Sequence, residues 1–355
     1  MAVHTTTHKA PVGATPLQGA ARALGLPSAT ALVIGSIIGT GVFTMPAVMA
    51  GAGTISILTL GVIAVGAVLL GLMFGQLTKR IPATDGGLYA YARHEFGDFA
   101  GYLTAWCYWI TCWAGNAAIV ASWVLYVKSF TTQAWGWTYP ANNNWPLFAI
   151  AMTGLWIPAA INLFGARSMS WFQNITVVLK FLPLLFVALF GWLFFAFATS
   201  NYPAFNASGG SWMTAVSLAS GVALFSFIGV EATSVATSKV RDPRRNVGRA
   251  TVIGTGMCAL LYVAVTAAVM GLVPSGKLAS DTAPFVSAFQ AMFPGHSWVG
   301  WFVALVAVVS GFGALIGWTL VTAEIARAAS KDVLFPESFG KTNRCLLYTS
   351  PSPRD

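Results

Sequence analysis

The sequence predicts an α-helical protein that crosses a membrane several times. Of its 355 residues, 56% are hydrophobic and only 8% are charged, whereas a soluble domain carries roughly 25% charged residues. Its apolar stretches are long enough to cross a hydrocarbon core as helices, which takes about 20 residues at about 1.5 Å each. A run such as 177–197 is apolar on every face, unlike the short alternating strands of a membrane β-barrel.

Eight such stretches are predicted to span the membrane. A polar segment over 78–98, between the second and third spans, predicts a short helix at the cytoplasmic interface. The first 25 or so residues lack the pattern of a cleaved signal peptide, and 344–355 have no helical period and read as foreign. We therefore expect a polar tail over 1–25, a membrane domain over 26–343 and a non-native tail over 344–355. The predicted spans are 28–49, 54–76, 99–127, 145–164, 172–198, 213–236, 250–274 and 299–322.

The positive charges predict the orientation of the chain. In a soluble protein a net charge of +9 would suggest a nucleic-acid partner, but here the cations fall in alternate loops. Only Lys128 and Lys277 lie in loops predicted to be outside, and Lys180 lies within the fifth span. Since cytoplasmic loops are rich in lysine and arginine, we expect a multi-pass protein of the plasma (inner) membrane with a cytoplasmic N-terminus and no nucleic-acid partner. The loops assigned to the cytoplasm contain, among others, Lys79, Arg80, Arg93, Lys239, Arg241, Arg244, Arg245, Arg249, Arg327 and Lys331.

A glycine-rich motif in the first span predicts a broken helix. Gly35, Gly39 and Gly41 lie close together, with Pro46 following. Each glycine costs a helix about 1 kcal/mol, and a break at this depth needs a ligand or a cavity to satisfy the freed backbone. In broken-helix transporters the new helix N-terminus faces an anionic group, while freed carbonyls bind a cation. The alternative is close helix packing through small residues.

Glu231 is the second polar feature of the membrane domain. Apart from Glu324, near the end of the eighth span, it is the only acidic residue well inside a predicted span. A charged group at such depth is costly unless it faces a polar interior, so its default interpretation is functional. Proton coupling or gating is one reading, and a neutral or paired glutamate that braces neighbouring helices is the other.

Aromatic and polar side chains in the third and eighth spans form the third feature. Aromatic residues in spans usually belong to the packed core or to the interface belt. An amide in the middle of a span is different, because it must find hydrogen-bond partners from neighbouring helices or from a ligand. The residues are Tyr108, Trp109, Thr111, Cys112, Trp113 and Asn116 in the third span and Trp318 in the eighth.

These motifs together resemble the amino acid, polyamine and organocation superfamily of permeases. The broad resemblance is carried by 39–46 (GTGVFTMP), 227–231 (FIGVE) and 239–246 (KVRDPRRN). A narrower resemblance, to basic amino acid antiporters of the arginine/agmatine exchanger type, is carried by 108–116 (YWITCWAGN) and 317–320 (GWTL). The likeness extends from about residue 26 to 343.

The resemblance implies an all-α, LeuT-like fold. In that fold two five-helix halves form an inverted repeat, two further helices follow, and the first and sixth spans are broken at the midplane. Eight of the expected twelve helices are predicted here, so the resemblance implies that the remaining four are missing from this chain and that the polypeptide is truncated.

The resemblance also assigns residues to a substrate site. The substrate carboxylate would meet the Thr40 hydroxyl and the amides of Thr40 and Gly41, next to Gly39. One departure concerns Phe225, which stands where arginine/agmatine exchangers have a gating tryptophan; a weaker cation–π gate is therefore implied. The carbonyls of Ile37, Phe225 and Ile228 would bind the substrate's ammonium, and Trp318 would stack on its aliphatic stem. The distal cation of the substrate would be reached by Thr111, Cys112 and Asn116. Proton coupling or gating would be provided by Glu231 together with Tyr108.

The function that the sequence predicts is secondary transport. The leading hypothesis is an antiporter that exchanges arginine, lysine or ornithine for a related amine or amino acid. The alternatives are a broad-range neutral amino acid permease, a non-transporting membrane sensor and an inactive truncated fragment. No phosphate-binding loop, catalytic constellation or metal-ligand spacing is present in the sequence, so we expect neither an enzyme nor a cofactor or metal. The expected partners are a small amino acid or amine and the lipid bilayer, and a homodimer is left open.

Overall fold

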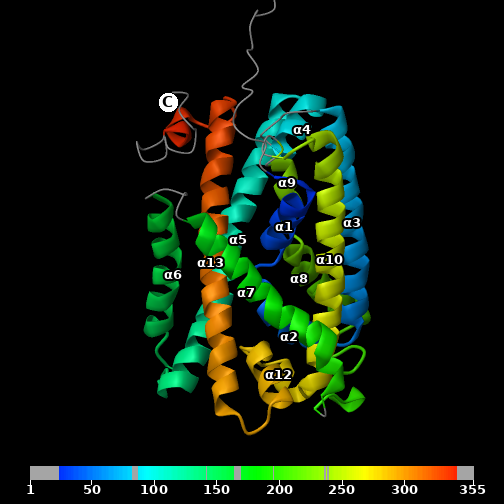
Figure 1. The fold of residues 1–355 in the computed structure, drawn as a ribbon, viewed down its shortest axis with the longest axis vertical. Helices are drawn as coiled ribbons and strands as arrows, with labels where there is room; N and C mark the ends of the chain where they lie inside the picture. The colour runs from blue at the N-terminus through cyan, green and yellow to red at the C-terminus, as the bar shows by residue number, and fades with distance from the viewer. Residues whose placement is uncertain are drawn as a thin grey trace, which may run out of the picture.

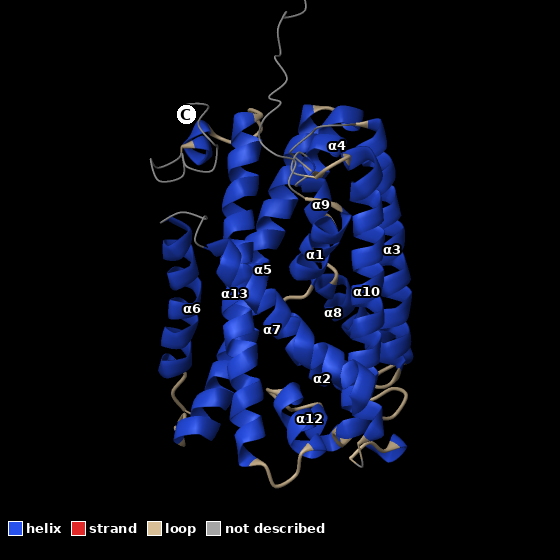
Figure 2. Ribbon diagram, viewed as in Figure 1, coloured by secondary structure: helices blue, strands red, loops and turns tan. Residues whose placement is uncertain are grey.

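The computed structural model describes residues 24–341, apart from 82–86, 141, 164–168, 195, 236 and 238–239. The described residues form helices joined by short loops, with one isolated β-bridge between Leu24 and Val240 and no strand ladder among them (Figure 2). The all-α fold predicted from the sequence is therefore confirmed. The tails expected over 1–25 and 344–355 lie outside the described residues, except for Leu24 and Gly25.

Among the described residues, six helices are long and apolar enough to cross a membrane, and a bent pair makes a seventh candidate span. The bent pair consists of α1 (Leu26–Ile37) and α2 (Gly41–Ala52), whose axes differ by 51°. The six long helices are α3 (Ile55–Arg80), α5 (Asp98–Trp135), α6 (Trp145–Leu163), α7 (Met169–Phe190), α10 (Pro243–Leu272) and α13 (Ser297–Lys331). The shorter elements are α4 (Leu88–Phe96), α11 (Ser275–Leu278), α12 (Pro284–Met292) and the 3-10 turns η2 (Gly191–Leu193), η3 (Thr199–Asn201) and η5 (Glu337–Gly340).

The predicted span over 213–236 is broken into two pieces. It consists of α8 (Trp212–Ser226), a turn over 227–231, and α9 (Ala232–Val235). Because α8 has 15 residues, it is about 22 Å long, which is less than the roughly 30 Å thickness of a hydrocarbon core. Within the described residues the structure thus supports seven of the eight predicted spans by length, and the sixth predicted span is discontinuous in its second half.

The helices pair as an inverted repeat predicts. A two-fold axis in the membrane plane relates each span of the first half to the span five positions later, and spans near the axis can then pack as pairs. The second and seventh spans, α3 and α10, lie side by side along their length, as do the third and eighth, α5 and α13 (Figure 1). The first span packs on α9 and α10 through α1 and on α8 through α2. By contrast, α6 lies at the periphery beside α13 and α5 (Figure 1).

One end of the molecule carries most of the described cations, and we call it the basic end. It is formed by α4, the end of α3, the start of α10 and the end of α13, opposite α12 (Figure 1). Among the described cations, Lys128, Lys180 and Lys277 lie elsewhere. This distribution is the one that the positive-inside rule associates with the cytoplasmic face, and the cytoplasmic orientation stays a prediction. The cations of the basic end are Lys79, Arg80, Arg93, Arg241, Arg244, Arg245, Arg249, Arg327, Lys331 and Lys341, which follows η5 beside the end of α13.

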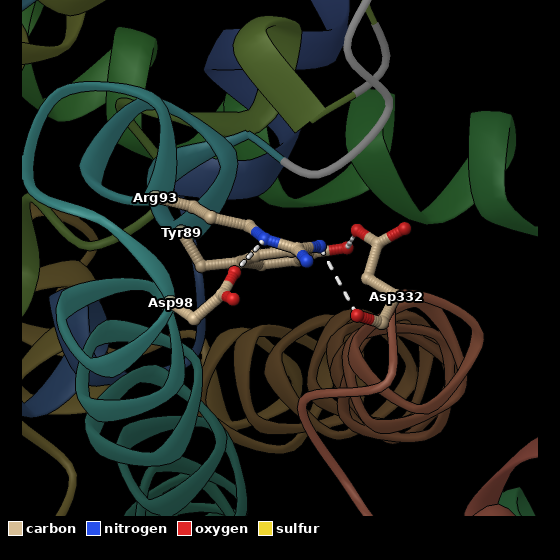
Figure 3. A network of polar contacts seen from close by, with 4 residues as sticks. All are labelled: Tyr89, Arg93, Asp98 and Asp332. Carbon is tan, nitrogen blue, oxygen red and sulfur yellow. Dashed lines mark hydrogen bonds and ion pairs between the residues drawn. The ribbon is translucent and has the colours of Figure 1, made fainter. Parts of the chain in front are cut away.

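A polar network at the basic end fastens α4 to the end of α13. The Tyr89 hydroxyl donates to Asp332 Oδ2 at 2.8 Å, and an Arg93 guanidinium nitrogen donates to the Asp332 backbone carbonyl at 3.1 Å (Figure 3). Arg93 also pairs with Asp98 at the start of α5, with Nε and Oδ1 at 2.7 Å. The short helix predicted within 78–98 is therefore confirmed as α4, which joins the two longest helices of the chain.

Candidate functional site

The break in the first span exposes backbone amides to an open space. Helix α1 ends at Ile37, Ile38 is extended, and α2 begins at Gly41. Within the described residues, no acceptor lies within hydrogen-bond reach of the amides of Thr40 and Gly41, which are orphan donors at the positive end of the α2 dipole. A methyl group built on Gly39 or Gly41 would meet no atom within 4 Å. The break therefore offers an anion-binding helix terminus with room beside it.

The break in the sixth span crosses the break in the first. Gly229 has φ +110°, a conformation that L side chains rarely adopt. A Cβ on Gly229 would lie 2.7 Å from the backbone carbon and oxygen of Ser36 and 2.9 Å from the amide nitrogen of Ile37. Only a glycine therefore allows the two breaks to come this close, and their freed backbone groups share one region of the membrane domain.

The carbonyls of the two breaks differ in what already binds them. Ile37 accepts hydrogen bonds from the Tyr262 hydroxyl and from the Gly39 amide, both at 2.9 Å. The Phe225 carbonyl accepts from the amide of Ile228 at 3.3 Å. In the described structure no donor reaches the carbonyl of Ile228. Of the three carbonyls expected to bind an ammonium, that of Ile228 is thus the one with both lone pairs available.

Thr40 lies where the third and eighth spans meet the first break. Its side chain is 2% exposed, and its hydroxyl donates to the Ile119 carbonyl of α5 at 3.3 Å. A Cβ added to Gly311 of α13 would lie 2.4 Å from the Thr40 methyl group. The hydroxyl expected to bind a carboxylate is therefore held by the protein in this structure, and it must rotate to serve a ligand.

Asn116 carries a buried acceptor with no partner. Its Nδ2 donates to the Cys112 carbonyl at 3.2 Å and to the Thr322 hydroxyl at 3.1 Å. The residue is 6% exposed, and its Oδ1 has no hydrogen-bond partner. Leaving a buried acceptor unsatisfied costs about 1–3 kcal/mol, and such an atom in a native structure calls for an explanation. A ligand donor at Oδ1 is one explanation.

The structure brings Glu231 and Tyr108 together. The Tyr108 hydroxyl donates to Glu231 Oε1 at 2.6 Å, and the amide of Gly229 donates to Oε2 at 3.0 Å. Glu231 is 4% exposed, so the carboxyl group links α5 directly to the break in the sixth span. On α5, Tyr108 lies 11 residues before Ile119, the partner of Thr40, so the two backbone positions are about 16 Å apart along the helix axis, with Tyr108 nearer the basic end.

The remaining predicted residues lie around this centre. The Phe225 ring is 40% exposed and packs toward Gly115 of α5, with Cζ 3.7 Å from where a Cβ on that glycine would be. Trp318 packs with Ile119 and its neighbours in a small apolar cluster between α5 and α13.

Cys112 is fully buried on the face of α5 that also presents Asn116. Thr111 donates back to the Cys107 carbonyl of its own helix at 2.9 Å, and no contact joins it to the two breaks in the described structure.

Three residues at this centre were not predicted from the sequence. Tyr262 and Thr322 are ordinary residues of their spans whose partners are more than 200 residues away in sequence. Lys180 had a visible signal, since a lone lysine within an apolar span is rarely accidental. Its Nζ donates to the Gly35 carbonyl at 2.8 Å and the residue is 4% exposed, so its charge lies near the negative end of the α1 dipole.

The chain is similar in sequence to known transport proteins. Residues 24–353 match the family model described as "Amino acid permease". The chain is 33% identical to the arginine/ornithine antiporter of Pseudomonas aeruginosa over 334 residues, which are 92% of this chain and 67% of that protein. It is 30% identical to the putrescine transporter PotE of Escherichia coli K12, over 92% of this chain and 72% of the relative. It is 29% identical to the cadaverine/lysine antiporter of the same strain, over 91% and 70%.

Proposed function

The chain belongs to the amino acid permease family, a family of transporters, and on that premise we propose that it is an antiporter for cationic amino acids. The exchange would bring in arginine, lysine or ornithine and release a related amine or amino acid across the cytoplasmic membrane. The observation that carries the proposal is the unpartnered, buried Oδ1 of Asn116. An acceptor buried at this depth suits a substrate with a second, distal positive charge.

At the end opposite its distal positive charge, the substrate would carry its α-carboxylate. The amides of Thr40 and Gly41 and the α2 dipole offer partial positive charge without a buried cation. The free carbonyl of Ile228 would accept from the α-ammonium nearby. This arrangement pairs both charges of a zwitterion with helix ends, which avoids the several kcal/mol that an unpaired charge costs inside the membrane.

The aliphatic stem of the substrate would run between these two ends. Trp318 lies one helical turn before Thr322, the residue that holds the Asn116 amide, so its ring is well placed to cover methylene groups. Cys112 and Asn116 would then face the distal cation from one side of α5. Phe225 would close the site from the sixth span, and Thr111 would take part only after a change of rotamer.

Arginine counterflow into proteoliposomes tests this assignment. In Asn116→Leu we expect arginine and ornithine uptake to fall about a hundredfold, because an apolar side chain leaves the distal cation without an acceptor. Asn116→Asp retains an acceptor oxygen, so we expect this variant still to take up arginine and ornithine. Asn162→Leu is the matched control, because Asn162 lies on peripheral α6 and donates to the Ile316 carbonyl, away from both breaks.

The same assay distinguishes the alternatives. If wild-type protein exchanges alanine or leucine but no cationic substrate, the chain is a neutral amino acid permease. Saturable arginine binding without counterflow would indicate a sensor or an inactive chain. Equal arginine uptake in wild type and Asn116→Leu would remove Asn116 from the site and contradict the assignment.

Glu231 provides a second test, through the pH dependence of exchange. Its carboxyl group holds Tyr108 and the Gly229 amide together, and protonation would replace one acceptor oxygen with a donor. In Glu231→Gln we expect arginine exchange to vary less between pH 5 and 8 than in wild type, because the amide cannot change its charge. The Tyr108→Phe variant, measured in parallel, should retain the pH dependence at a lower rate. An unchanged pH profile in Glu231→Gln would rule out this role.

A further inference from the structure

A groove on the outer surface of the helix bundle lies between α3 and α10 at the basic end. Its volume is about 370 Å³. The two helices touch at the floor of the groove, where a Cβ on Gly75 would lie only 2.6 Å from the Cα of Gly248. With no side chain at either position, the flanking residues of the two helices form walls on both sides of this contact.

The walls at the basic end carry three cations. Lys79 of α3 and Arg245 and Arg249 of α10 line the groove and are exposed. The ion pairs found among the described residues use Arg93, His94 and Arg327 instead. The described protein therefore provides no anion for the three groove cations, and their positive fields add within one small volume.

The walls further along the groove are apolar. Leu72 lies seven residues before Lys79 and Ile253 four residues after Arg249, so the groove changes from cationic to apolar over about 6–10 Å along the helix axes. Leu72 is 48% and Ile253 is 45% exposed, and both belong to long apolar helices. A polar residue, Gln76, lies between the two regions and can donate hydrogen bonds.

We propose that this groove binds an anionic phospholipid of the bilayer. The headgroup phosphate would be held by Lys79, Arg245 and Arg249, and an acyl chain would follow Leu72 and Ile253 along the apolar part. The groove lies at the end of two spans, where headgroups meet the hydrocarbon core, and basic pockets between helices at this level suit anionic headgroups. A soluble anion would use the cations but would leave the apolar walls uncovered.

The bound lipid would also brace the helices that support the broken spans. Helix α10 packs closely on α1, since a Cβ on Gly254 would lie 2.8 Å from the Cβ of Val33. The same helix carries Tyr262, whose hydroxyl binds the Ile37 carbonyl. A lipid that bridges α3 and α10 therefore stabilises the pair against which the first break rests, and the protein should resist heat better when the lipid is bound.

The test compares lipid binding by full-length purified protein in detergent. Phosphatidylglycerol and phosphatidylcholine are added separately, and retained lipid is measured by mass spectrometry together with the temperature at which half of the protein loses its monodisperse peak. We expect wild type to prefer phosphatidylglycerol about tenfold or more and to be stabilised by it. The variant Lys79→Gln, Arg245→Gln, Arg249→Gln should lose both effects.

A second triple variant controls for general electrostatics. Arg80→Gln, Arg241→Gln and Arg244→Gln remove the same charge from the same end, at exposed positions outside the groove, and should keep both effects. Ile253→Trp fills the apolar part without any change of charge, and it should weaken phosphatidylglycerol binding even if the groove triple variant fails to fold. Equal loss in the two triple variants, or full binding in Ile253→Trp, would overturn the site. Displacement of the lipid by inorganic phosphate at equal concentration would show a soluble-anion site instead.

Discussion

Gly229→Ala is expected to cause a large loss of stability. The added Cβ would lie 2.7 Å from the Ser36 carbonyl group, and the backbone there has φ +110°. A strained backbone of this kind costs on the order of 1–3 kcal/mol, and overpacking against rigid backbone adds a similar amount. The measurement is the temperature at which half of the detergent-solubilised protein stays monodisperse, which we expect to fall far below that of wild type.

A glycine in the same span provides the control for that measurement. Gly221 lies inside α8, and a Cβ there would meet nothing within 4 Å. Gly221→Ala is expected to leave stability unchanged or to raise it by up to about 1 kcal/mol, because alanine favours the helix. If Gly229→Ala were as stable as Gly221→Ala, the close crossing of the two breaks would be wrong.

Gly41→Leu is expected to abolish exchange while the fold remains intact. A side chain at Gly41 would extend into the open space beside the amides of Thr40 and Gly41, which is where the proposed carboxylate binds. Because the added Cβ meets no protein atom within 4 Å, we expect the cost to appear in transport and not in stability. We expect arginine counterflow to fall at least about a hundredfold, equivalent to roughly 2.7 kcal/mol of lost binding.

The control for this variant adds the same side chain elsewhere. Gly61 lies on α3, and a Cβ there also meets nothing within 4 Å. Gly61→Leu should transport as wild type does. A Gly41→Leu protein that unfolds would contradict the open space at the break, whereas one that folds and transports normally would remove the carboxylate site from that position.

The helical architecture could be predicted from the sequence because it depends on local pattern. Long apolar runs and alternating charged loops indicated the spans, and glycine at Gly39 and Gly41 indicated the first break. The break in the sixth span was harder to predict. Only the family resemblance implied it, because it depends on the backbone conformation of Gly229, which is required by contact with Ser36, nearly 200 residues earlier.

The candidate site was predictable where its residues are unusual for a membrane span. Glu231 and Asn116 stand out because a buried acid or amide is costly without a partner. Tyr262 and Thr322 did not stand out, since tyrosine and threonine are common in spans and only the packing of α10 and α13 makes them partners of the breaks. Pairings across such sequence distances carry no local signal.

The hydrogen bond from Tyr262 to Ile37 has a consequence for how tightly any ligand can be held. Both lone pairs of that carbonyl are in use, so an ammonium that moved from Ile228 to Ile37 would have to replace a hydroxyl or an amide of the protein itself. The free energy gained is then a difference between two similar bonds, not the whole of one. On the proposed function, Ile37 would therefore add little to the affinity for the substrate, and the binding of its ammonium would depend mainly on Ile228.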